Sequence, residues 1–314
     1  MIGIKAIGKY LPDDRTSNFD RMDKFSMTAS FVREKIGFTH VALKTPDQDT
    51  SDLCEKAWVN LQEQEQISTE EIECMIVCTQ NPDGHGLPHT SAILHEKLSL
   101  SHECAVFDIS LGCSGYVYGL SIIKSFMESN GFHKGLLFTA DPYSKVMNHD
   151  DKKTATLFGD GATATLLTEN PIFDFGNFVF GSDGSKKEGI IVKEDGHIHM
   201  NGRAVFAFTV RVIPNSILKM LKINGIKLEN IDRFLLHQGS LHIVNSIADA
   251  LGVARDKCPF NSADFGNTVS SSVPMILAQE FNNQKMKIAV LAGFGVGLSW
   301  GTTLIFRNNR STIN

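Results

Sequence analysis

The sequence has little of what marks nucleic-acid-binding, membrane and secreted proteins. It contains no long run of Lys and Arg, and 30 basic residues against 35 acidic ones give a net charge of −5. We therefore set aside a nucleic-acid partner. No uninterrupted apolar segment reaches the roughly 18 residues of a membrane span. The N-terminus, from Met1 onward, lacks the basic and apolar regions of a signal peptide. We expect a cytoplasmic protein with no membrane span.

Cysteine pairs and metal-binding patterns are also missing. The six cysteines form no CxxC pair, and most lie in apolar runs, which indicates reduced thiols rather than a disulfide framework. His85 and His89 flank Pro88, which breaks the helical geometry that their spacing would need, and no set of carboxylates completes a site. We therefore expect no metal site.

What is present is a globular composition with alternating strands and helices. A chain of 314 residues with 42% hydrophobic residues can bury two ordinary domains or one duplicated one. Apolar runs at residues 72–79 and 104–110 predict buried strands. Helical spacing predicts helices at residues 51–64, with Ser51 as the cap, and at residues 115–130. This alternation predicts an α/β fold with helices on the faces of parallel sheets.

The second half of the chain repeats this plan. Its expected elements are helices at residues 211–221, 241–251 and 272–284 and strands at residues 234–236, 287–293 and 302–306. We infer two similar halves, residues 1–170 and 171–314. Because no flexible linker separates them, we expect the halves to pack as one rigid body.

A cysteine stands where a predicted strand turns into a predicted helix, in the stretch Phe107 to Leu120. Cys113 at this junction would see the positive end of the helix macrodipole, which favours the thiolate. Its small neighbours Gly112 and Ser114 leave the sulfur accessible from one side. The alternative is a buried structural cysteine, as free cysteines usually are.

Two later motifs favour a reactive Cys113 over a structural one. His237 follows the apolar run at residues 234–236, and the ends of parallel strands are where α/β sheets place their sites. The alternative is a histidine that is hydrogen-bonded in the core. Asn267 lies on a glycine turn before small residues that open a helix, where the alternative is an ordinary turn and helix cap.

Taken in the order Cys113, His237, Asn267, these motifs resemble those of the β-ketoacyl-ACP synthase III group of condensing enzymes. The resemblance runs from Ile4 to Phe306. Further matching motifs are Gly8-Lys9-Tyr10-Leu11-Pro12, Phe158-Gly159-Asp160-Gly161-Ala162 and Gly293-Phe294-Gly295-Val296-Gly297-Leu298-Ser299-Trp300-Gly301. The resemblance implies the thiolase fold, with duplicated βαβαβαββ halves in layers ordered α-β-α-β-α.

By this resemblance, Cys113 is the nucleophile that takes an acyl group from a thioester, because a thiolate is a good nucleophile and a good leaving group. His237 and Asn267 would donate hydrogen bonds to a malonyl thioester while carbon dioxide leaves, and so stabilise the developing negative charge. The resulting carbanion would attack the acyl group in a decarboxylative Claisen condensation. The backbone N–H groups of Cys113 and Val296 would form the oxyanion hole.

The resemblance also implies a substrate-binding set. Its members are Phe31, Lys35, Leu87, Lys152, Phe206 and Ser240. Phe31 and Lys35 stand where a Trp and an Arg usually hold the adenine of coenzyme A, and Lys152 replaces a phosphate-binding Arg. Leu87 matches the position that reaches across a homodimer to close the acyl pocket. Ser240 stands in place of an Asn.

The departures from the family pattern concern the partner. Positions that are usually basic hold Ala207, His242, Asp249 and Ala250, which reduces the docking surface for an acidic carrier protein. We expect acyl-CoA or an acyl carrier protein to deliver the substrates, no cofactor, and a specialised pathway rather than housekeeping fatty-acid synthesis. One alternative is an acyltransferase that passes the acyl group to O or N without decarboxylation, in secondary metabolism or surface-sugar synthesis. Another is a catalytically silent partner subunit, against which the three intact residues argue.

Overall fold

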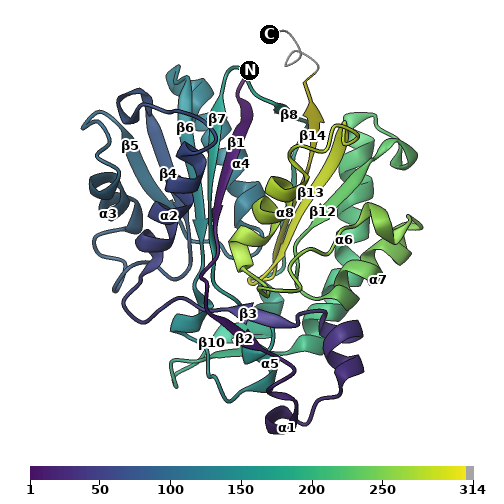
Figure 1. The fold of residues 1–314 in the computed structure, drawn as a ribbon. Coiled ribbons are helices and arrows are strands. Elements are labelled where there is room, and N and C mark those ends of the chain that lie inside the picture. The colour runs from purple at the N-terminus through teal and green to yellow at the C-terminus, as the bar shows by residue number, and fades with distance from the viewer. Residues whose placement is uncertain (309–314) are drawn as a thin grey trace.

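The first half of the chain builds five neighbouring strands of a ten-stranded mixed sheet (Figure 1). The structure, a computed structural model, describes residues 1–308. In sheet order the five strands are β1 (Gly3–Tyr10), β7 (Ala162–Thr168), β6 (Lys134–Ala140), β4 (Cys74–Cys78) and β5 (Ala105–Ile109). Strand β4 is parallel to β5 and β6, whereas β7 is antiparallel to β1 and β6. Every residue of β4 is buried, as its continuous apolar run predicts.

The second half repeats the order and directions of β4, β6, β7 and β1, and no strand among the described residues matches β5. Its strands are β12 (Arg233–Leu236), β13 (Ile288–Gly295), β14 (Ser299–Arg307), β8 (Phe173–Phe175) and β9 (Val179–Ser182). Strand β12 is parallel to β13, and β14 is antiparallel to β13, β8 and β9. Strands β12, β13 and β14 thus correspond to β4, β6 and β7. The predicted duplication is confirmed, while its boundary at residues 170 and 171 stays a prediction.

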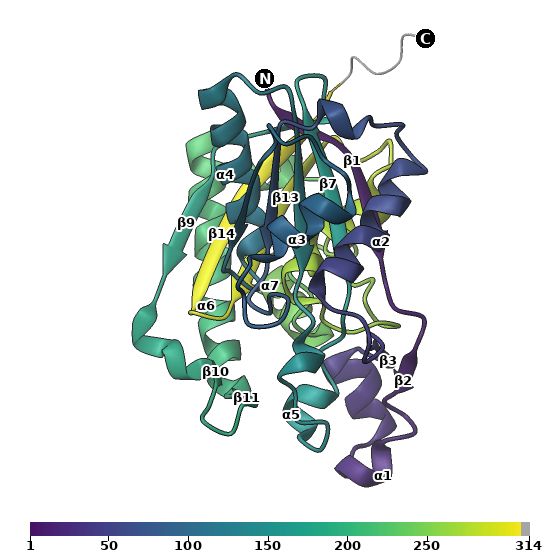
Figure 2. The ribbon, with the colours of Figure 1, turned by 90° about the vertical axis from the view of Figure 1, so that its left-hand side faces the viewer.

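Helices form three layers around the two halves of the sheet, which lie side by side in Figure 1; Figure 2 faces the outer helices of the first half. The main helices are α2 (Thr50–Gln62), α3 (Thr90–Lys97), α4 (Gly115–Asn130), α6 (Gly202–Asn224), α7 (Leu241–Leu251) and α8 (Ser272–Glu280). Helices α4 and α8 contact strands of both halves and form the middle layer. Helices α2 and α3 pack on the outer side of the first half, and α6 covers the second half with α7 packed against it. The α-β-α-β-α layering is therefore confirmed.

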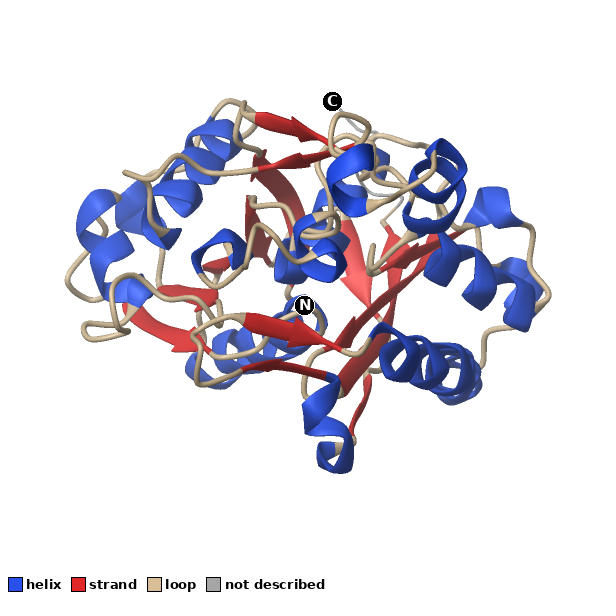
Figure 3. Cartoon of the chain, turned by 90° about the horizontal axis from the view of Figure 1, so that it is seen from below, coloured by secondary structure: helices blue, strands red, loops and turns tan. Residues whose placement is uncertain are grey.

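The remaining elements are short and gather at the lower end of Figure 1, which Figure 3 shows from below. They include α1 (Met22–Phe25), a π-helical turn (Phe31–Ile36), α5 (Lys152–Ala155), β2 (Arg15–Ser17), β3 (His40–Ala42), β10 (Ile190–Val192) and β11 (Ile198–Met200). Four short 3-10 turns (Thr69–Glu71, Gly184–Gly189, Leu228–Asn230 and Arg255–Lys257) and two more near the site (Tyr143–Lys145 and Val269–Ser271) complete the fold.

The cap of α2 differs from the prediction. Asp49, not Ser51, caps this helix: its carboxylate accepts a hydrogen bond from Thr50 N–H at 2.8 Å, and Asp52 closes a capping box. The Ser51 hydroxyl instead donates to Asp83 at 2.7 Å. The cap therefore lies two residues before the predicted one, since Ser51 is already within the first helical turn.

Helix α6 is long and apolar enough, by length and composition alone, to cross a membrane. Arg211 and Lys219 interrupt its apolar sequence. Half of its most apolar window is buried in the fold (50%), and it packs against β13, β14 and α7. Its apolar side, which includes Ile213 and Ile217, is accordingly built into a core cluster.

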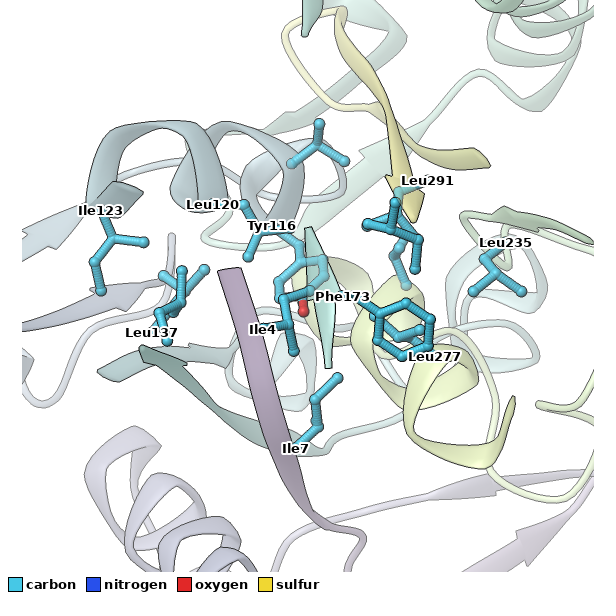
Figure 4. Close-up of a cluster of buried hydrophobic side chains, with 14 of the residues drawn as sticks. Ile4, Ile7, Tyr116, Leu120, Ile123, Leu137, Phe173, Leu235, Leu277 and Leu291 are labelled. Atoms are coloured by element: carbon cyan, nitrogen blue, oxygen red, sulfur yellow. The ribbon is translucent and has the colours of Figure 1, made fainter. Parts of the chain in front are cut away.

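A single hydrophobic core joins the two halves (Figure 4). Ile4 and Tyr116 from the first half share this cluster with Leu235 and Leu291 from the second, and all four are fully buried. The sheet is also continuous across the boundary, because Ile4 pairs with Phe173 of β8. The halves are therefore packed against each other without an intervening linker.

Candidate active site

Three polar residues from distant parts of the chain line one cavity of about 440 Å³. Cys113 lies just before α4, His237 follows β12, and Asn267 lies in the loop that leads to α8. Their exposed fractions are 3%, 3% and 4%. The structure thus brings together the three residues that the motifs predict, although more than a hundred residues of chain separate Cys113 from the other two.

Two backbone donors face the sulfur of Cys113. The N–H groups of Cys113 itself and of Val296 both act to lower the pKa of the thiol. Burial outweighs them and raises the pKa of Cys113 to about 12. Burial in the packed site therefore opposes the effect of the helix N-terminus, which by itself favours the thiolate. The two N–H groups lie where an oxyanion hole requires donors, and their role stays a prediction.

The glycine-rich turn between β13 and β14 is fixed close to the nucleophile. The Ser299 hydroxyl donates to the Val296 carbonyl at 2.9 Å, and its oxygen lies 2.6 Å from Ser114 Oγ. Gly295 has φ of 159°, and a Cβ at this position would lie 2.7 Å from Cys113 Sγ. Only glycine lets this backbone approach the sulfur so closely.

His237 and Asn267 are each oriented by a second group, and we call the two residues the donor pair. Asn267 Oδ1 accepts a hydrogen bond from Val269 N–H at 2.9 Å, which leaves the Asn267 amide N–H groups free to donate to a ligand. His237 Nδ1 lies 2.6 Å from the hydroxyl of Ser272. That hydroxyl oxygen accepts from Gln238 N–H at 3.4 Å, and its own proton points to Nδ1 in the tautomer that carries the ring proton on Nε2. Burial lowers the pKa of His237 to about 3, so the imidazole is neutral.

The expected substrate-binding residues fall into three places. Phe31, Lys35, Phe206 and Ser240 line the same cavity as the donor pair. Lys152 lines an adjoining groove of about 730 Å³ that shares Phe31 with the cavity, and its Nζ lies 4.8 Å from the centre of the Phe31 ring. Leu87 lines neither space. It is 93% exposed on the loop before α3.

Two side chains at the cavity have contacts that the motifs did not reveal. The Ser240 hydroxyl accepts a hydrogen bond from Ile243 N–H at 3.2 Å and so caps α7, which ties it to the helix. His242 stacks on Phe206, with ring centres 4.8 Å apart and nearly parallel planes. Lys35 Nζ lies 5.8 Å from the centre of the same Phe206 ring. One wall of the cavity is thus a layered set of a cation and two flat rings.

A metal centre finds no support in the part of the chain that the structure describes. Within residues 1–308 no group of three or more His, Cys, Asp or Glu side chains could hold a metal ion. His85, His89 and His95 belong to no such group.

The comparisons with known proteins agree on one family. A family model described as 3-oxoacyl-[acyl-carrier-protein (ACP)] synthase III matches residues 107–184, and the model of its C-terminal part matches residues 221–306. A beta-ketoacyl-[acyl-carrier-protein] synthase III of Oceanobacillus iheyensis is 31% identical over 97% of this chain and 98% of the relative. One of Clostridium perfringens is 33% identical over 97% and 98%.

Solved structures give the same result. A 3-oxoacyl-(acyl-carrier-protein) synthase III crystal structure superposes with a TM-score of 0.90 at 31% identity, over 97% of this chain and 99% of the other. The enzyme of Thermus thermophilus superposes with a TM-score of 0.90 at 28% identity, over 98% and 99%. The similarity therefore covers nearly the whole chain.

Proposed function

Because this chain belongs to the 3-oxoacyl-[acyl-carrier-protein] synthase III family, we propose that it joins an acyl thioester to a malonyl thioester with loss of carbon dioxide. It is a condensing enzyme of the acyltransferase class. The observation that carries the proposal is the convergence of a buried thiol and two neutral donors on one cavity. The reported relatives do not favour transfer of the acyl group to O or N.

In the first half-reaction Cys113 takes the acyl group. Its sulfur attacks the thioester carbonyl, and the bond between that carbon and the departing sulfur breaks. The thiol proton of Cys113 passes to the departing thiolate, so no net charge accumulates in the buried site. The N–H groups of Cys113 and Val296, which already face the sulfur, would hold the oxyanion that forms in between.

In the second half-reaction the donor pair holds the carbonyl of the malonyl thioester. The bond to the malonyl carboxylate breaks, its electrons form an enolate, and carbon dioxide leaves. The enolate carbon then attacks the acyl carbonyl, and the bond from that carbon to the Cys113 sulfur breaks. The released thiolate takes a proton from solvent, which restores the Cys113 thiol for the next cycle. A neutral His237 suits this step, because its pKa of about 3 makes the Nε2–H a hydrogen-bond donor that does not protonate the carbanion.

We propose that coenzyme A or an acyl carrier protein delivers both substrates. Lys152 beside the Phe31 ring, at the outer groove, offers a cation for a phosphate and a flat ring for a base. The surface of α7 offers less to an acidic carrier, because Arg255 is bound at 2.7 and 2.9 Å by both oxygens of Asp249. This pairing supports a specialised partner or pathway.

Three further properties are proposals of the same kind. A homodimer would give the exposed Leu87 a place in the partner's acyl pocket. No cofactor is needed, because the thiol and the donor pair supply each group that the two half-reactions use. A cytoplasmic location fits the six free and buried cysteines, and disulfide bonds in protein isolated from its native source would contradict it.

Mass spectrometry of the intact protein tests the proposed reaction. After incubation with acyl-CoA thioesters of graded length, we expect one acyl adduct on Cys113, which malonyl thioester then discharges to a β-ketoacyl product. His237→Ala and Asn267→Ala should still form the adduct but discharge it about 100-fold more slowly or worse. Cys258→Ser, a change at another buried cysteine, is the control and should behave as wild type. The absence of an adduct with any donor, or an adduct that malonyl thioester leaves intact, would overturn the proposal.

A further inference from the structure

Asp141, directly after β6, is a fully buried carboxyl group, and no cation among residues 1–308 compensates its charge. Its Oδ1 accepts a hydrogen bond from Gln80 N–H at 2.7 Å and has longer contacts of 3.4 Å with Thr79 Oγ1 and Asn81 Nδ2. Its second oxygen, Oδ2, is buried and has no hydrogen-bond partner among the described residues. The mechanism described above does not use this carboxyl group.

Ser270 is the counterpart of this oxygen. Its hydroxyl faces the Asp141 carboxyl and lowers the pKa of that group. Ser270 Oγ is nevertheless buried and, within the described residues, also has no partner of standard geometry. A buried polar atom without a partner destabilises the fold, because it has lost its hydrogen bonds to water. Two such atoms that face each other therefore favour a direct hydrogen bond after a small local shift.

Ser270 belongs to a segment that orients the donor pair, residues 268–272, which we call the serine turn. Ser272 holds His237, and the N–H of Val269 holds Asn267. Val269 has φ of 53°, a strained value for a β-branched residue, so the turn depends on its surroundings to keep this shape. Ser271 supplies one anchor, since its hydroxyl donates to the Thr139 carbonyl at 2.9 Å.

Asp141 also reaches toward the nucleophile. Gln80, whose N–H binds Asp141, accepts a hydrogen bond through Oε1 from the Tyr143 hydroxyl at 3.2 Å. The same Oε1 lies so close to Gly112, the residue before Cys113, that a Cβ there would approach it to 2.6 Å. The carboxyl group therefore lies between the loop that carries the nucleophile and the serine turn.

We propose that Asp141 is a positioning residue for the condensation: through Ser270 it holds the serine turn in the shape that presents the donor pair to the malonyl thioester. This inference rests on the proposed function, because it assigns a role in the decarboxylation step. Asp141 touches neither substrate nor the reacting atoms. It acts through the turn and, when ionised, through its charge.

The ionisation state of Asp141 gives the proposal a distinctive signature. Burial raises the pKa of Asp141 to about 7. The titratable groups that face it are Cys54, Cys78, Cys113 and Tyr143, and burial raises the pKa of each, so they are neutral. Below about pH 7 the carboxyl group is neutral, and above it the carboxylate accepts from the Ser270 hydroxyl, which is why this hydroxyl lowers its pKa. Above it, a carboxylate adds negative charge beside a site where an enolate must form. Carbon dioxide release should therefore fall as the pH rises through about 7.

The test measures carbon dioxide release from a radiolabelled malonyl thioester between about pH 6 and about pH 8.5. Asp141→Asn keeps the shape of the side chain and stays neutral, so we expect activity near the low-pH wild-type level and no fall through about pH 7. Ser270→Ala should lower kcat for release about 10-fold or more, with a smaller change in KM and in the rate of Cys113 acylation. Asp108→Asn and Ser216→Ala change an N-capping carboxylate and another buried serine. These controls should keep both the rate and the pH profile of the wild type.

The outcomes separate the positioning role from the function on which it rests. If the wild type releases carbon dioxide and Asp141→Asn keeps the wild-type fall with pH, the positioning role is wrong while the function stands. The role is equally wrong if a folded Ser270→Ala, checked by circular dichroism, releases carbon dioxide at the wild-type rate. If the wild type releases none, the proposed function fails first and the inference with it. Ser270→Ala removes the other partner of the contact between Asp141 and Ser270. It therefore tests the positioning role even if Asp141→Asn does not fold.

Discussion

Among single residues, Gly295 packs so closely against Cys113 that no side chain fits between them. Its backbone passes so close to Cys113 that a Cβ would meet both Sγ, at 2.7 Å, and Cβ, at 2.8 Å, of that residue. Gly293, two residues earlier, would meet the Cys113 carbonyl oxygen at 2.7 Å. These contacts keep the N–H of Val296 beside the sulfur, so the geometry of the proposed oxyanion hole depends on glycine.

We expect Gly295→Ala to reduce acylation of Cys113 about 100-fold or more, because the added methyl group must displace either the turn or the sulfur. The measurement is the rate of adduct formation by intact-protein mass spectrometry. Gly184→Ala is the matched control, since a Cβ there meets nothing within 4 Å. Acylation of Gly295→Ala at the wild-type rate would show that the turn does not need this close approach.

The sequence could locate the residues whose chemistry is unusual, but not those that hold them. Cys113, His237 and Asn267 are recognisable because they match the family's motifs in the same order along the chain. Ser270 and Asp141 carry no such signal. A serine before a helix is most often a cap, and a carboxylate most often lies on the surface. Their partners lie far away in the sequence, so only the folded chain shows what they contact.

At the scale of elements, local signals decided which predictions succeeded. The predicted bounds of α4 and α7 agree with the structure, and both helices end at a glycine in the left-handed region, Gly131 and Gly252, each with φ of 68°. Such C-caps are strong local signals. The buried strand β4 was equally clear, because its apolar run is continuous. Strong capping and burial patterns thus account for the agreement.

Elements that depend on distant partners escaped prediction. Strands β8 and β9 are three and four residues long and exist only as partners of β14 and β1. Helix α6 begins at Gly202 rather than at residue 211, because Asn201 caps it through the N–H of Ala204. Gly202 and the β-branched residues Val205 and Thr209 have weak helical preference, so the start of this helix depends on its cap and on packing.

At the scale of the whole molecule, two surface features favour a second copy of this chain. Strand β5 is an edge of the sheet with half-buried residues along its length, and exposed edges invite pairing. Leu87, on the loop between β4 and α3, is an aliphatic side chain that is 93% exposed. We expect light scattering to give twice the 34.6 kDa of one chain. A mass of one chain at micromolar concentration would contradict the dimer.

The continuous sheet and the shared core also predict that the two halves unfold together. Isolating either half would expose the cluster that Ile4 and Tyr116 share with Leu235 and Leu291, so neither half should be stable while the other is unfolded. The chain offers a direct probe, because it has only two tryptophans and one lies in each half, Trp58 in α2 and Trp300 in β14.

Trp58→Phe leaves fluorescence that reports on the second half, and Trp300→Phe leaves fluorescence that reports on the first. In urea, each variant should give one transition whose midpoint agrees with its own far-ultraviolet circular dichroism, because one cooperative unit loses both halves at once. All samples need the same protein concentration, since dimerisation would shift the midpoints. If fluorescence and circular dichroism separated in either variant, the halves would be independent folding units, and the boundary between residues 170 and 171 would mark two domains rather than one duplicated core.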